Sequence, residues 1–106
     1  MKPSLSYGLS PKIIADLQDI FHRFDRVQKV LLYGSRALGR EKPGSDIDLT
    51  IVAPQMDLTE LLKIENEIED LMLPYKVDLS LLHHIDSDAL KDHIHRAGIE
   101  FYKKGP

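Results

Sequence analysis

Apolar residues recur in two alternating patterns along this 106-residue chain, and the alternation restricts the fold more than any other feature. Helical spacing marks three segments, at about 11–25, 57–73 and 87–97. Short apolar runs typical of strands mark 27–33, 46–53 and 76–82, with a possible short last strand at 99–102. Strands that alternate with helices predict an α/β (α+β) domain, in which helices flank a small mixed β-sheet.

Residues with strong end preferences agree with the predicted helices. Ser10 and Pro11 provide a capping hydroxyl and an N1 proline at the start of the first helix. Asp57, followed three residues later by Glu60, has the form of a capping box, and we expect the helix that starts there to continue until Pro74.

The length predicts a single domain over residues 1–106, with residues 1–9 as a flexible N-terminal tail. A chain of this size has no room for a second domain that binds another substrate. We therefore expect a partner to complete whatever the protein acts on, as a homo- or hetero-oligomer.

Composition excludes several classes of protein. A formal net charge of −3 argues against broad binding of a nucleic-acid backbone. The absence of cysteine excludes disulfides and thiolate zinc sites. No apolar run reaches the roughly eighteen residues of a membrane span, and the first ten residues do not resemble a secretory signal, so we expect a cytoplasmic protein.

Two aspartates open the second predicted strand. Asp46 and Asp48 are separated by one residue, so the period of two places both carboxylates on one face, with Cα atoms about 6.6 Å apart. Like charges this close repel each other, and a cation between them allows both to stay ionised. Carboxylates without His or Cys at comparable spacing favour Mg²⁺, or Mn²⁺, over zinc.

A third carboxylate lies in the next predicted strand, where Asp78 stands between Val77 and Leu79. If the two strands are neighbours, this carboxylate reaches the same site. Three carboxylates provide ligands for two ions about 3.5–4 Å apart, as in phosphoryl transfer. The predicted catalytic and metal-binding residues are Asp46, Asp48 and Asp78.

A glycine and a serine directly follow the first predicted strand. Gly34 lets a ligand approach the backbone because it lacks a Cβ, and Ser35 adds a hydroxyl to the N–H groups that can bind phosphate oxygens there. For Arg36 and Arg40, a surface salt bridge is as consistent with the sequence as a phosphate contact. No covalent nucleophile accompanies these residues, so positioning and charge stabilisation would have to promote the reaction.

The order of these residues resembles the signature of the DNA polymerase β-like nucleotidyltransferase superfamily, and the short length is similar to its minimal nucleotidyltransferase (MNT) branch. The resemblance rests on Gly34-Ser35, a spacer with Ala37 and Gly39, and the run Gly44-Ser45-Asp46-Ile47-Asp48-Leu49. It extends from about Val30 to Leu82, with Asp78 at the place of the third carboxylate. The predicted nucleotide-binding residues are accordingly Gly34, Ser35, Arg36 and Ser45.

The resemblance implies a mixed sheet with flanking helices and Mg²⁺-dependent transfer of a nucleoside monophosphate, AMP from ATP, to a hydroxyl. It also implies a helical HEPN-type protein as partner, with this chain as the antitoxin of a toxin–antitoxin pair. Two alternatives stay open. The chain could neutralise its partner by contact alone, or it could act on a small molecule.

The histidines carry a weaker signal. His83 and His84 are adjacent, and a pair two residues apart on a helix, such as His93 and His95, does not share a face. We therefore expect all four to be surface or capping residues rather than metal ligands.

Overall fold

The structure, a computed structural model, describes residues 5–105. Its elements, in chain order, are α1 (Pro11–His22), β1 (Lys29–Tyr33), β2 (Ile47–Val52), α2 (Leu58–Glu69), β3 (Val77–Leu81), the 3-10 helix η1 (Leu82–His84), α3 (Asp88–Ala97) and β4 (Ile99–Lys103). None of the helices in the described range is long and apolar enough to span a bilayer.

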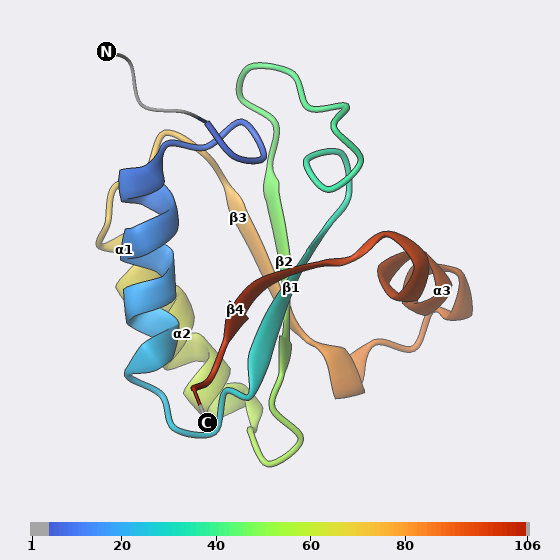
Figure 1. The fold of residues 1–106 in the computed structure, drawn as a ribbon. Coiled ribbons are helices and arrows are strands. Elements are labelled where there is room, and N and C mark those ends of the chain that lie inside the picture. The colour runs from blue at the N-terminus through green and yellow to red at the C-terminus, as the bar shows by residue number, and fades with distance from the viewer. Residues whose placement is uncertain (1–4, 106) are drawn as a thin grey trace.

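The four strands form one mixed sheet in the order β3-β2-β1-β4, which confirms the predicted fold class. β2 and β3 are parallel, and the connection between them contains α2. The pairs β1–β2 and β1–β4 are antiparallel. Figure 1 shows α1 and α2 on one side of the sheet and α3 on the other.

The hydrophobic core lies between the sheet and the pair α1 and α2. Alternate strand residues point into it, and many of them are fully buried, among them Val30, Leu32, Ile47, Leu49 and Ile51. The intervening residues therefore point to the opposite face, which α1 and α2 leave uncovered. Asp48 and Asp78 belong to this second set.

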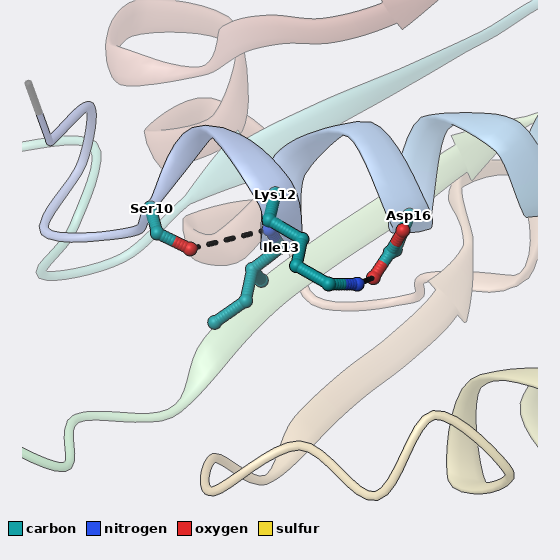
Figure 2. A network of polar contacts seen from close by, with 4 residues as sticks. All are labelled: Ser10, Lys12, Ile13 and Asp16. Carbon is teal, nitrogen blue, oxygen red and sulfur yellow. Dashed lines mark hydrogen bonds and ion pairs between the residues drawn. The ribbon is translucent and has the colours of Figure 1, made fainter. Parts of the chain in front are cut away.

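Local hydrogen bonds explain where α1 begins. The Ser10 hydroxyl accepts a hydrogen bond from the Ile13 backbone N–H at 3.3 Å, and Pro11 follows at a position where no N–H is needed. One turn along, Lys12 forms an exposed ion pair with Asp16 (Figure 2). The predicted cap is confirmed.

The first two helices end earlier than predicted. α1 stops at His22, because the next two backbone N–H groups bond three residues back, from Arg23 to Ile20 and from Phe24 to Phe21. α2 stops at Glu69, well before Pro74. Tightened bonds of the same kind close its last turn, and Met72 then has a φ of 55°.

Of the predicted flexible tail over residues 1–9, residues 1–4 lie outside the described range, and the segment 6–9 forms a turn in the structure. Ser6 and Leu9 exchange two backbone hydrogen bonds, and the Leu9 side chain is 0% exposed in the main core. Burial of Leu9 makes this short turn part of the packed domain, which the polar sequence around it did not indicate.

Candidate active site

Strand pairing brings two of the three predicted carboxylates together. Asp48 of β2 is the register partner of Asp78 of β3, and both side chains point to the face that α1 and α2 leave uncovered. Neighbouring strands lie about 4.8 Å apart, so the two carboxylates are adjacent. Asp46 lies just before β2 and is exposed.

The charges of this group act on one another. Burial raises the pKa of Asp48 above its ordinary value, and the nearby charges of Asp78 and then Asp46 raise it further. The positive charge of Arg36 acts in the opposite direction. Neighbouring carboxylates that disfavour the ionised form of Asp48 provide the negative potential that a bound cation would neutralise.

The carboxylates are not arranged as a finished metal cage. Within residues 5–105, no group of three or more His, Cys, Asp or Glu side chains has a geometry that could hold a metal ion. Asp46 and Asp78 are exposed, and like charges at this spacing repel one another.

Gly34 lies directly against Asp48. Its φ is 78°, and a Cβ added there would collide with the Asp48 carboxylate. The Gly34 backbone N–H donates to His93 Nε2 at 3.0 Å, so it is not free for a phosphate oxygen. The neighbouring Ser35 N–H and hydroxyl donate to no group among the described residues, which makes Ser35 the phosphate-binding candidate of the pair.

Arg36 has a different role from the phosphate contact considered above. Its side chain is 3% exposed, and its donors go to the backbone carbonyls of Tyr7, Ser45 and Asp46 at 2.7 to 3.3 Å. The guanidinium also lies over the Tyr75 ring, 4.7 Å from its centroid. Arg36 therefore fastens the loop that leads into Asp46, whereas Arg40 is exposed.

Ser45 is occupied within the same loop. Its hydroxyl accepts a hydrogen bond from the Lys42 backbone N–H at 2.8 Å, and its own N–H donates to the Lys42 carbonyl at 3.0 Å. These bonds close a turn around the exposed Gly44. The structure thus places Ser45 beside Asp46, with its side chain committed to the loop.

Sequence reasoning missed two residues of the site. Tyr33 is the register partner of Asp48 and is 8% exposed, and burial raises its pKa, with the charges of Asp78 and Asp48 adding to the rise and a hydrogen bond with Ser80 opposing it. The strand period indicates the face of Tyr33 from the sequence. His93 was predicted at the surface, and only the packing of α3 brings it to Gly34.

A cavity of about 390 Å³ opens next to Asp78, between α2 and the edge strand β3. Its lining includes Glu65, Glu69 and Lys76 as well as Asp78. Within residues 5–105, β3 pairs with β2 alone and forms one edge of the sheet.

The sequence profile of the family described as "Polymerase beta, Nucleotidyltransferase" matches residues 15–106, which include the loop and all three aspartates. The chain belongs to this nucleotidyltransferase family. The resemblance predicted from the motifs is therefore confirmed. A search of curated proteins gave no match.

Solved toxin–antitoxin structures share the nucleotidyltransferase fold of this chain. A chain from a toxin–antitoxin crystal structure with AMP-PNP superposes with a TM-score of 0.66 at 21% identity, over 88% of this chain and 73% of that one. A chain of the MntA-HepT complex gives 0.58 at 22% identity, over 88% and 68%. The same four values hold for a re-refined complex of the tri-AMPylated HEPN toxin with the MNT antitoxin from Shewanella oneidensis. At these identities the comparison establishes the fold.

Proposed function

We propose that this nucleotidyltransferase domain transfers AMP from ATP to a hydroxyl group of a protein partner. The pairing of Asp48 with Asp78 carries the proposal, because it sets two carboxylates side by side near the starts of β2 and β3. Phosphoryl transfer depends mainly on positioning and charge stabilisation, which such a site can provide.

Mg²⁺ suits the donor set, which consists of hard carboxylate oxygens, and Mn²⁺ is its closest substitute. Asp46, Asp48 and Asp78 would hold two ions, together with oxygens of the triphosphate. When bound, the metal would neutralise the triphosphate and lower the pKa of the attacking hydroxyl.

The protein's own residues would do the rest of the work. Ser35 would bind phosphate oxygens through its N–H and hydroxyl, and Gly34 would keep this loop against Asp48. Asp78 lies on the edge strand β3, and the acceptor would approach it from that edge. In the reaction, the acceptor oxygen bonds to the α-phosphorus, the bond to pyrophosphate breaks, and the hydroxyl proton is released.

The structural neighbours support a protein as the acceptor. These include a complex with AMP-PNP and a tri-AMPylated HEPN toxin bound to its MNT antitoxin. We infer that the partner of this chain is also a helical HEPN-type protein, and that the chain is the antitoxin of the pair, acting in the cytoplasm.

Labelled ATP tests the proposal. The chain is incubated with Mg²⁺ and a HEPN-type protein encoded beside it, in parallel with ATP labelled at the α-phosphate and ATP labelled at the γ-phosphate. We expect the partner to become labelled from the α-phosphate alone, with release of pyrophosphate. The Asp46→Asn/Asp48→Asn double variant should leave the partner unlabelled, and equal labelling by this variant would disprove the assignment.

A contact-only antitoxin is the second candidate, favoured by the absence of a preformed three-ligand metal group within residues 5–105. In that case the partner would be neutralised without acquiring label. Asp78→Ala separates the two candidates. Neutralisation that survives this substitution at full strength would favour contact alone.

A further inference from the structure

One contact joins α3 to the loop after β1. The Gly34 N–H donates to His93 Nε2 at 3.0 Å across 59 residues of sequence, in a partly buried position. The His93 ring also meets the Tyr33 ring edge to face, with centroids 6.2 Å apart and an interplanar angle of 77°. To accept this hydrogen bond, His93 has to be neutral and carry its proton on Nδ1.

The geometry of α3 makes the contact specific to one of its histidines. Successive helical residues are about 100° apart, so His93 and His95 point in directions that differ by about 200°. His93 is half-buried against the loop, whereas His95 is exposed and borders a cavity lined mainly by apolar residues, among them Leu31 and Ile94.

Gly34 has little freedom to move without disturbing the site. Its carbonyl accepts the Leu38 N–H at 3.2 Å, which closes the turn after Ser35, and its α-carbon faces the Asp48 carboxylate. Glycine can adopt a φ of 78° but also many other values, so the residue type alone does not fix the backbone conformation at position 34. The hydrogen bond from the Gly34 N–H to His93 restricts this conformation further.

We infer that His93 is a positioning residue for nucleotide binding, which holds Gly34 so that the Ser35 N–H and hydroxyl face the triphosphate beside Asp48. The inference rests on the proposed function for its consequence in catalysis. Its structural part, the hold on Gly34, does not depend on any activity.

Steady-state kinetics of transfer distinguish positioning from a general loss of structure. His93→Ala loses one hydrogen bond to a phosphate-binding loop, and we expect the KM for ATP to rise up to about tenfold while kcat falls less. His93→Gln places an amide oxygen near the position of Nε2 and should restore most of the KM. His95→Ala, the matched control on the same helix, should behave as the wild type.

The Gly34 amide signal in a nitrogen-15 NMR spectrum provides the readout that needs no activity. In His93→Ala this signal should shift and its proton should exchange faster with solvent, while His95→Ala leaves both unchanged. An unaltered Gly34 amide in a folded His93→Ala variant would overturn the inference, as would tighter ATP binding by that variant, which would mean that His93 obstructs the loop. A wild type that binds ATP but transfers nothing would count against the proposed function only.

Discussion

At the scale of single residues, Gly34 shows how closely the backbone of the loop after β1 packs against the Asp48 carboxylate. Its positive φ alone would make glycine favourable, but the position is restricted a second time by the Asp48 carboxylate. Gly39 shares a positive φ of 70° and has open space where a Cβ would stand. Substitutions at the two glycines can therefore be compared to separate the effect of backbone strain from that of a collision with Asp48.

Gly34→Ala and Gly39→Ala should differ in function more than in backbone strain. Each substitution places an alanine at positive φ, which costs about 1–2 kcal/mol of stability. Only Gly34→Ala also displaces Asp48, so we expect it to lose ATP binding while Gly39→Ala keeps it. Calorimetric titration with ATP and thermal unfolding measure both effects. Equal ATP affinity of the two variants would contradict the claim that the close approach of Gly34 to Asp48 is needed for ATP binding.

Asp48→Asn should change how stability depends on pH when no metal is present. The pKa of Asp48 is raised in the folded state, so the stability gained from its protonated form is present below the ordinary value of 3.8 and is lost as pH rises through the raised pKa. The asparagine variant escapes that loss. At neutral pH with a chelator we expect its Tm to be higher by about 1–5 °C, since Asp48 is only partly buried.

The difference in Tm between wild type and Asp48→Asn should shrink as pH falls below the ordinary carboxyl pKa, where Asp48 is protonated in both the folded and the unfolded chain. Thermal unfolding by circular dichroism at several pH values follows this difference. A difference that stays constant with pH would mean that the ionisation of the partly buried Asp48 is not its source.

At the scale of secondary structure elements, the loop between β1 and β2 is held by a residue whose role is mechanical. Arg36 donates to carbonyls from the N-terminal turn and from both residues that precede β2. Arg36→Ala would remove the donors of these partly buried carbonyls and leave a cavity where the buried side chain was, so we expect a loss of about 2–4 kcal/mol in the free energy of unfolding.

Arg40→Ala is the matched control for Arg36→Ala, because it removes the same charge from an exposed position four residues on. Its effect should stay within about 0.5 kcal/mol. Urea denaturation of both variants provides the comparison, and similar losses of stability would contradict the mechanical role of Arg36.

The short turn before α1 is open to a similar test. Leu9→Ala should cost about 2–5 kcal/mol, as expected for a fully buried leucine, whereas Leu5→Ala, at 64% exposure, should cost little. If Leu9→Ala unfolds at the same urea concentration as the wild type, the turn contributes no more than a tail would.

Patterns within an element were predictable from the sequence, while contacts between distant elements were not. The period of two along the strands identified the face of Asp48 and Asp78, and capping preferences located the starts of the helices. The roles of Arg36, Leu9 and His93 depend on segments brought together by folding. No local pattern around these three residues records which segment each one meets.

At the scale of the whole molecule, the proposed function assigns nucleotide binding to this chain and the acceptor hydroxyl to a partner. The core lies between α1, α2 and one face of the sheet, and the carboxylates lie on the other face, next to an open strand edge. The domain has a radius of gyration of 13.4 Å and folds around this single sheet. Under the proposed function, the acceptor hydroxyl of the partner protein reaches Asp78 from this open edge.

The intact mass of the partner tests this account most directly. After incubation with ATP, Mg²⁺ and the wild-type chain, the HEPN-type partner should gain the mass of one or more AMP groups, and it should gain none with the Asp46→Asn/Asp48→Asn variant or with a chelator. A partner that loses its toxic activity at unchanged mass would contradict nucleotidyl transfer as the function of this site.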